Sequence, residues 1–449
     1  MQHFSYQRIT GCVVLVFLIV SSTPTLAQSI ADGAASIARK VSFREYLEAV
    51  EQNNLDLQSQ RENITSAKAG VSIAGVRPDP QFTAGISSLE LNPANRDSEA
   101  TATTAGIAVT IETAGKRGKR IRAAEGNVRL TEANVGDFLR QLDLDAASAF
   151  VEVCRAREAL KRKQSSLKSF QAVVLANETR FKVGDIGMLE LRKSRVEADR
   201  YATEVTSTGA DASVAVTNLS VPLGKPIDEI FPQRVVDCEL KTESLRFELE
   251  SLLRQALENR HDVQVAKAAV DTSRANLELA RANRWVDPTV NVGLIYTPQI
   301  QPVYDGAGNV INQPTLASSS SLGLTVTVPI PFSRLQRGEL IQAETALKQA
   351  QLQLRSVLLK AETEVRATYT QYQAAFLNIR RYSEHVLTDA EHVLEAVRIS
   401  YRKGAASLLD LLDAQRTADD VYLNYLQALA VLANTTVKLQ LSAGMRADL

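Results

Sequence analysis

Residues 106–130 read GIAVTIETAGKRGKRIRAAEGNVRL, and this stretch decides how the rest of the chain is interpreted. Its first part alternates apolar Ile107, Val109 and Ile111 with small or polar residues, which is typical of a strand with one apolar face. A bend rich in Gly, Lys and Arg follows, and a long polar helix begins after it. Residues 323–347, GLTVTVPIPFSRLQRGELIQAETAL, make the same change of period. The sequence therefore predicts two strand-to-helix joins.

The segments around the two joins occur in the same order, which indicates a tandem duplication. Each half is predicted to contain a helix, a β-hairpin, a long helix, a turn and another helix. The first repeat spans 28–243, with its hairpin at 81–112, its turn at 183–187 and an equatorial segment at 222–243. The second repeat spans 244–449, with its hairpin at 289–328 and its turn at 403–406. The helices are predicted over 42–75, 116–182, 188–221, 244 or 248 to 285, 335–402 and 407–441.

The first 27 residues resemble an export signal. Arg8 precedes a short apolar run at 11–20, and Ala27 ends a small-residue cleavage site. The apolar run is too short for a comfortable membrane span. Cys12 lies before this run, whereas a lipid-attachment cysteine should follow it, so we do not expect lipidation. Cleavage after residue 27 would remove one basic residue, so the mature chain would carry 50 basic against 51 acidic residues.

The composition favours extended helices and argues against nucleic-acid binding. Basic and acidic residues are balanced at 51 each, and aromatic residues make up only 5% of the chain. Cys154 and Cys238 remain after signal cleavage. They could pair in an oxidising compartment, although two separated cysteines are more often unpaired, so the sequence leaves this bridge open.

The predicted lengths suggest a rod that meets a membrane. A helix over 116–182 would be about 100 Å long at ~1.5 Å per residue, and each flanking helix would be about half as long. The strands have the length of tilted transmembrane strands, but four strands cannot close a barrel, which needs about eight. Several chains would then have to share one barrel. The alternative is a soluble four-stranded cap on a helical bundle; the export signal and the paired hairpins favour the membrane.

Several motifs resemble the TolC family of outer-membrane efflux channels over essentially the whole mature chain. They are the duplicated plan, the turn glycines Gly184 and Gly404, and the hexapeptide LDLLDA at 409–414. Within the family, the chain is similar to the CzcC-type subgroup tied to heavy-metal resistance. IETAGKR at 111–117 resembles that group's ELGGKR stretch, and PIPF at 329–332 with RGE at 337–339 resembles its PLPLF and RNQGE stretches.

The resemblance implies a homotrimer with a shared twelve-stranded β-barrel and a helical tunnel that crosses the periplasm. The protein would lie in the outer membrane of a Gram-negative bacterium, docked to a periplasmic adaptor and an inner-membrane pump of the resistance-nodulation-division (RND) class. It would be a passive conduit for divalent heavy-metal cations or small toxic compounds, with no cofactor and no nucleic-acid partner. One alternative from the same family is the exit duct of a type I protein-secretion system, and another is a periplasmic coiled-coil scaffold without transport.

The resemblance also places an aperture at the tip of the second repeat. Asp410 and Asp413 lie three residues apart on one helical face and would form carboxylate rings under threefold symmetry. A simpler explanation is a capping box, because Ser407 stands three residues before Asp410. Tyr401 and Glu190 match positions of the family's closing network.

Ala406 stands where TolC itself has an arginine that bridges neighbouring helices, so we expect a different latch.

The two turns and the two joins complete the candidate sites. Gly184 and Gly404 would admit adaptor helices closely, although a C-cap glycine alone explains them. The candidate join residues are Gly115, Lys116, Arg117, Pro329 and Pro331. The basic run at 116–122 would face inner lipid headgroups, or it would simply be a solvated helix start.

No metal site or catalytic site is predicted. His261, His385 and His392 show no metal-ligand spacing, and the chain contains no recognisable nucleophile–base set or phosphate-binding loop. We therefore predict that the protein is not an enzyme.

Overall fold

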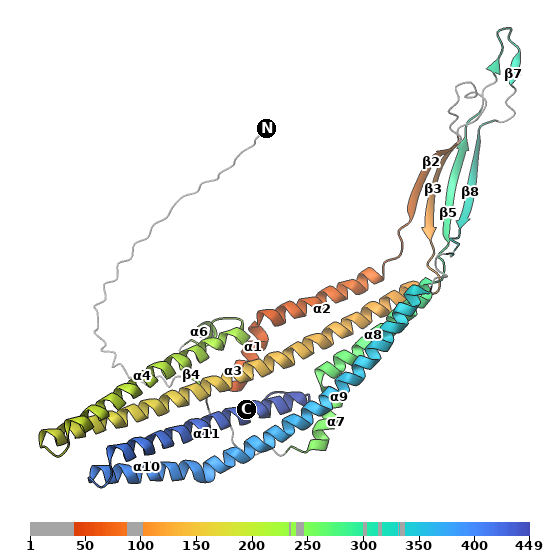
Figure 1. Cartoon of the computed structure of the whole chain (residues 1–449). Helices are drawn as coiled ribbons and strands as arrows, with labels where there is room; N and C mark the ends of the chain where they lie inside the picture. The colour runs from red at the N-terminus through yellow and green to blue at the C-terminus, as the bar shows by residue number, and fades with distance from the viewer. Residues whose placement is uncertain are drawn as a thin grey trace, which may run out of the picture. The chain divides into compact units, whose positions relative to one another are not determined.

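The computed structural model describes residues 40–87, 102–232, 235–238, 247–299, 303–312, 317–330, 332 and 337–449. The predicted signal peptide at 1–27 and the join residue Pro331 lie outside these ranges. In the unit formed by residues 40–449, long helices carry a β-sheet at one end and two helical hairpin tips at the other (Figure 1). The prediction of a mainly helical chain with a small β part is confirmed. No helix in the described ranges combines the length and the apolarity needed to cross a membrane.

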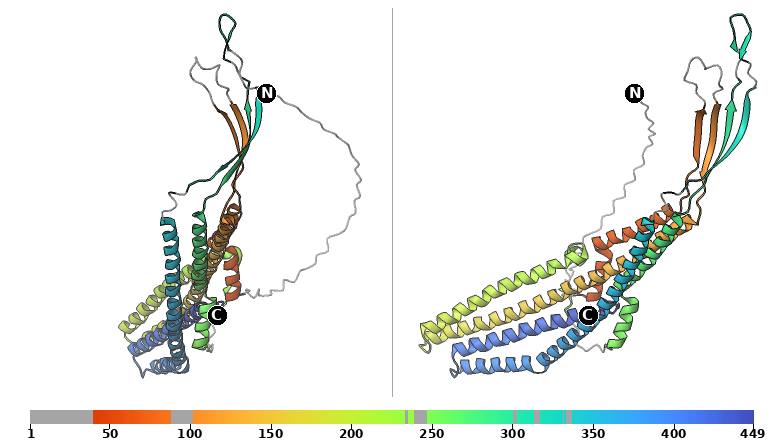
Figure 2. Two further views of the ribbon diagram at one scale, coloured as in Figure 1. Left: turned by 90° about the vertical axis from the view of Figure 1, so that its right-hand side faces the viewer. Right: turned by 45° about the vertical axis from the view of Figure 1, so that its right-hand side comes forward.

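The two predicted repeats share the order helix, strands, long helix and closing helix, and each adds short elements of its own. The first contains β1 (Lys40–Val41), α1 (Phe43–Asn53), α2 (Leu55–Ala74), β2 (Gln81–Ser87), β3 (Ala102–Thr110), α3 (Lys116–Lys182), α4 (Met188–Asn218), α5 (Ser220–Leu223), α6 (Ile227–Ile230) and β4 (Val235–Val236). The second contains α7 (Leu249–Asn259), α8 (His261–Asn283), β5 (Thr289–Thr297), β6 (Val303–Tyr304), β7 (Val310–Asn312), β8 (Ser319–Thr327), α9 (Gly338–Arg381), the π-helical turn η3 (Tyr382–Val386), α10 (Leu387–Arg402) and α11 (Leu408–Ser442). The hairpins α3–α4 and α10–α11 lie beside each other, because α11 packs against α3 (Figure 2).

Each repeat divides a helix that the sequence predicts as continuous. The helix predicted over 42–75 breaks at Asn54, and the helix predicted up to 285 breaks at Arg260. Gly224 and Gly444 have φ values of +73° and +76° and pack on these breaks. A Cβ atom would come within 2.7 Å of a backbone atom at Gly224 and within 2.9 Å at Gly444. Glycine is therefore needed at both contacts. Asn54 also caps α2, since its side chain accepts from the Leu57 N–H.

The long helix predicted over 335–402 is interrupted by η3, whose wider turn connects α9 to α10. The Tyr382 ring in this turn lies 6.3 Å from the Tyr425 ring of α11. A π-helical turn inserts one residue into the helical spacing, so α10 continues with a shifted face. The sequence contains neither proline nor glycine here, and the interruption was not predicted.

The four long strands form one antiparallel sheet in the order β2-β3-β5-β8. Ile107 pairs with Phe82 on one side and with Val292 on the other, and Val292 pairs with Leu324. β2 and β8 are edge strands within the chain. The two hairpins are thus joined through β3 and β5, and the sheet stays open.

The main core lies at mid-length, where α1, α3, the α4–α6 segment and the C-terminal turn meet. Tyr46 packs against Phe150, and its hydroxyl donates to the Leu219 carbonyl at 3.0 Å. Cys154 in α3 is bonded to Cys238 just after β4, with a Cα–Cα distance of 5.1 Å. The bridge that the sequence left open is present, and it fastens the equatorial segment to the longest helix.

Candidate functional site

One face of the sheet is a continuous exposed apolar surface. The row Phe82, Ile107, Val292 and Leu324 crosses all four strands, and neighbouring rows add Leu294, Leu322 and Val326. Phe82 and Leu324, at the two edges, are 75% and 69% exposed. A monomer in water rarely exposes so large an apolar patch, whereas a strand facing lipid requires one.

The opposite face carries mostly small side chains and no charged ones, with Ile295 as a larger apolar residue. Gly106, Gly293 and Gly323 form one row beside Thr83. A Cβ at Gly106 would lie 2.8 Å from Asn291 Oδ1 and 3.0 Å from the Gly293 Cα, so larger residues do not fit there. None of the four long strands contains a charged residue. A strand of a membrane barrel is expected to alternate in this way, with apolar side chains on one face and small or polar side chains on the other.

The basic residues at the joins are mostly engaged within the chain. The Lys116 ammonium is buried; it donates to the Trp285 carbonyl at 2.7 Å and pairs with Asp287 at 2.5 Å. Arg117 donates to the Gly75 carbonyl at 2.7 Å, and Arg120 donates to carbonyls at 74 and 76 while pairing with Glu112. These carbonyls end α2 and α8, where backbone acceptors lack helical partners and the helix dipole favours cations. A solvated helix start is therefore wrong for Lys116, which is buried, whereas Arg117 is exposed and Arg120 is half-buried. The position of the run near inner lipid headgroups stays a prediction.

Of the remaining predicted join residues, the structure describes Gly115 and Pro329. Gly115 is the N-cap of α3 with a φ of +66°, a backbone conformation that favours glycine. Pro329 follows β8 and is exposed. A pocket of about 680 Å³ lies at this level between α3, α8 and α9, lined by Lys116, Asp287, Glu339 and their neighbours.

The two tips end in the same turn geometry. Gly184 has a φ of +79° and Gly404 a φ of +75°, and in each turn the next residue donates to a carbonyl five positions earlier. This is a Schellman motif. A Cβ at either glycine would meet nothing within 4 Å, so the glycines serve the backbone conformation, and the space beyond them is open.

Tyr401 and Glu190, which the sequence places in a closing network, are in contact. The Tyr401 hydroxyl lies 3.1 Å from Glu190 Oε1 and 2.8 Å from Oδ1 of the fully buried Asn177. Burial raises the pKa of Tyr401, so its proton stays in place. This contact ties the end of α10 to α3 and to the start of α4.

Asp410 and Asp413 are both exposed near the start of α11. Asp410 completes a capping box, since its Oδ2 accepts from the Ser407 backbone N–H and hydroxyl, each at 2.8 Å. These bonds hold the pKa of Asp410 below its usual range. No cluster of three or more metal-ligating side chains occurs in the described ranges. The simpler capping explanation therefore holds for Asp410, and a role in the aperture requires other copies of the chain.

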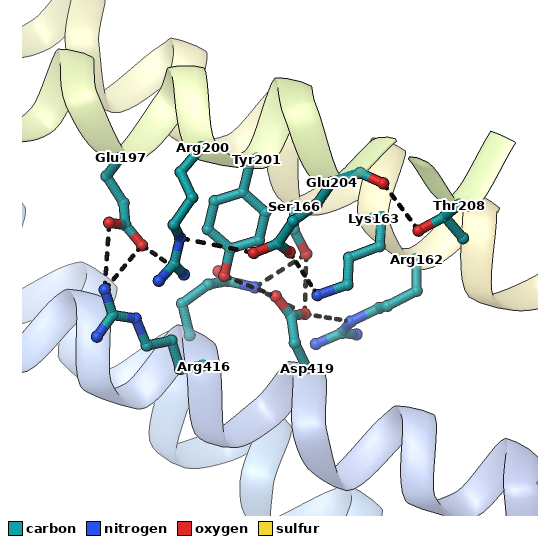
Figure 3. Close-up of polar contacts among 11 residues, drawn as sticks. Arg162, Lys163, Ser166, Glu197, Arg200, Tyr201, Glu204, Thr208, Arg416 and Asp419 are labelled. Carbon is teal, nitrogen blue, oxygen red and sulfur yellow. Dashed lines mark hydrogen bonds and ion pairs between the residues drawn. The ribbon is translucent and has the colours of Figure 1, made fainter. Parts of the chain in front are cut away.

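A buried polar cluster above the tips was missed in the sequence. Figure 3 shows Asp419 of α11 surrounded by side chains of α3 and α4. Asp419 is 1% exposed, and its carboxylate accepts bonds from Arg162, Ser166, Tyr201 and Gln415. The available signal was the spacing of Gln415 and Asp419, two polar residues on the apolar stripe of α11.

The geometry defines a class of protein: a rod of helical hairpins whose sheet presents one lipid-compatible face and needs further strands to close. The outer membrane efflux protein family matches residues 46–223 and 252–445, and the chain belongs to that family.

The chain is 23% identical to the cobalt-zinc-cadmium resistance protein CzcC of Cupriavidus metallidurans, over 84% of each protein. It is also 23% identical to outer membrane protein TolC of Escherichia coli, over 64% of this chain and 58% of that one. The crystal structure of the Campylobacter jejuni CmeC outer membrane channel superposes with a TM-score of 0.71 at 15% identity, covering 90% of this chain and 85% of CmeC. The protein is therefore an outer-membrane efflux channel that extends into the periplasm, and it is not an enzyme.

Proposed function

We propose that three copies of the chain assemble into one conduit through the outer membrane and the periplasm. The observation that carries this proposal is the open sheet with one apolar face and no charged strand residue. Its edges, β2 and β8, cannot face lipid unpaired. Pairing β8 of one copy with β2 of the next gives twelve strands in a trimer, which exceeds the smallest barrels of about eight.

The helical part would then form a passive tunnel that ends at a periplasmic tip. The Gly184 and Gly404 turns would dock a periplasmic adaptor, which connects the channel to an inner-membrane RND-type pump. The open space beyond both glycines and the exposed Val183 and Leu409 beside them support this role. The pump would supply the energy.

At the aperture, Asp410 and Asp413 would each form a ring of three carboxylates, six in all. Such rings attract cations, and Coulomb attraction between close charges is strong enough to concentrate them. The similarity to a cobalt-zinc-cadmium resistance protein supports divalent heavy-metal cations as the cargo, with small toxic compounds as the other class.

A deletion strain tests the cargo. We expect it to become sensitive to Zn²⁺, Co²⁺ or Cd²⁺, and we expect the intact gene to restore growth. Rescue should fail with Asp410→Ala combined with Asp413→Ala, and should succeed with Asp420→Ala, an exposed acid on the same helix. Sensitivity only to organic drugs would overturn the metal assignment, and loss of a secreted protein instead would indicate a type I secretion duct.

A further inference from the structure

The buried cluster around Asp419 connects side chains from both predicted repeats. Asp419 Oδ1 accepts from Arg162 Nε at 2.7 Å, from Ser166 Oγ at 2.8 Å and from Gln415 Nε2 at 3.1 Å. Its Oδ2 accepts from the Tyr201 hydroxyl at 3.0 Å. The carboxylate is on α11, whereas Arg162 and Ser166 are on α3 and Tyr201 is on α4. One side chain of the second hairpin is therefore held by both helices of the first.

Arg162 extends the cluster to the fourth helix. Its Nη1 pairs with Glu391 of α10, and its guanidinium lies 5.1 Å from the centre of the Tyr422 ring. Alongside, Arg416 of α11 pairs with Glu197 of α4 at 3.1 Å (Figure 3). All four tip helices thus take part.

The polar cluster around Asp419 restrains the helices in a different way from the apolar contacts nearer the tip. Apolar side chains of α3, α4, α10 and α11 pack against each other toward the tip, and such contacts are not directional, so helices can slide and repack. Hydrogen bonds to a buried charge are directional, and an unpaired charge left behind is costly. A movement of α11 relative to α3 would separate Asp419 from Arg162.

The duplication supplies an internal comparison. Gly184 aligns with Gly404, and the same alignment places Asp199 of α4 at the position of Asp419. Asp199 is exposed, and its carboxylate makes no hydrogen bond among the described residues. The acid is common to both repeats, but only the copy in α11 is enclosed.

We propose that Asp419 is a positioning residue of the aperture: it fastens α10–α11 to α3–α4 and so sets where Asp410 and Asp413 stand. This inference rests on the proposed aperture. Asp419 lies nine residues along α11 from Asp410, about 13 Å at ~1.5 Å per residue. At that distance a small rotation of α11 about Asp419 moves the carboxylates at the tip. Tyr401 and Glu190 hold the tip itself, so the described arrangement, which the proposal takes as the closed position, is supported at two levels.

Conductance of the purified full-length protein in planar bilayers tests this role. Arg162→Met combined with Asp419→Leu removes both buried charges, and the only ion that loses a partner is Glu391, whose side chain is half exposed, so folding should survive. We expect the ratio of open to closed time to rise at least about tenfold, with an unchanged helical signal and thermal midpoint. Asp199→Asn is the matched control and should behave as the wild type.

Three outcomes separate the possibilities. If the double variant folds and its open ratio equals that of the wild type, the positioning role is overturned. If the double variant fails to fold, Asp419→Asn and Ser166→Ala provide the same comparison in milder form, and wild-type gating in both would also overturn it. If Asp410→Ala with Asp413→Ala leaves conductance and block by Zn²⁺ unchanged, the aperture itself is wrong, whatever Asp419 does.

Discussion

Replacing Asp143 by Asn should make the stability of the protein much less dependent on pH. Asp143 lies on α3 in the mid-length core and is 6% exposed. Its Oδ1 has no hydrogen-bond partner in the described ranges, and the nearby Glu51–Arg446 pair faces it from α1 and the C-terminal turn. Burial, with a further contribution from Glu51, raises the pKa of Asp143 to about 7.

The sign and size follow from proton linkage. Because the folded-state pKa is raised, the folded protein retains a proton that the unfolded chain loses above about pH 4. Stability therefore falls as pH rises from about 4 to about 7, and then levels off. The full loss is ~4 kcal/mol at ~1.4 kcal/mol for each pKa unit, of which about 2 to 3 kcal/mol appears between pH 5 and pH 8.

Denaturant unfolding of detergent-solubilised protein at pH 5 and pH 8 measures this effect. We expect Asp143→Asn to gain about 2 to 3 kcal/mol more over the wild type at pH 8 than at pH 5. The comparison between two pH values cancels any direct effect of the amide on packing. Asp145→Asn, an exposed acid two residues away, should show no such difference. An advantage of Asp143→Asn that is the same at both pH values would refute the buried, proton-retaining carboxyl.

Two further predictions concern the join and the bridge. Lys116→Met should lower the free energy of unfolding by about 2 to 4 kcal/mol, because it leaves Asp287 without its cation. The thermal midpoint of the helical signal should fall as well. Lys119→Met removes only a looser ion pair, at 3.9 Å, and should leave the midpoint unchanged. An unchanged midpoint for Lys116→Met would count against the buried pair. Removing the Cys154–Cys238 bridge, which spans 84 residues, should lower the free energy of unfolding by about 4 to 5 kcal/mol. Reductant should therefore destabilise the wild type but not a variant with both cysteines changed to Ala. Equal sensitivity of the two proteins to reductant would contradict this.

The features that could be predicted from the sequence are those with a local period. The change from alternation to helical spacing marks both strand-to-helix joins, and the family resemblance that rests on such motifs is confirmed. The helix breaks at Asn54 and Arg260 were not predicted, and the glycines that lie against them, Gly224 and Gly444, are some 170 to 190 residues away in the sequence. Likewise, nothing local shows that Lys116 is buried: its partners lie in the other repeat.

The site residues divide in the same way. The capping box at Ser407 and the turn glycines follow from local rules, and the structure adds the contacts made by Tyr401. The roles of Asp410 and Asp413 in an aperture stay predictions, because a ring exists only between copies of the chain. Sequence reasoning misses buried polar groups in general, since burial is decided by which helix covers a face.

The acid that occupies the same position in both predicted repeats has a different environment in each. In the first repeat, the acid at the shared position, Asp199, is exposed on α4, which packs mainly along α3. In the second repeat, α11 packs against α3, α9 and α10, so the equivalent Asp419 is enclosed and needs a cation. The ion pair between Asp419 and Arg162 therefore fastens the hairpin α10–α11 to α3. The four long strands contain no charged residue, so we expect any selection by charge to come from the proposed carboxylates of Asp410 and Asp413 at the helical end.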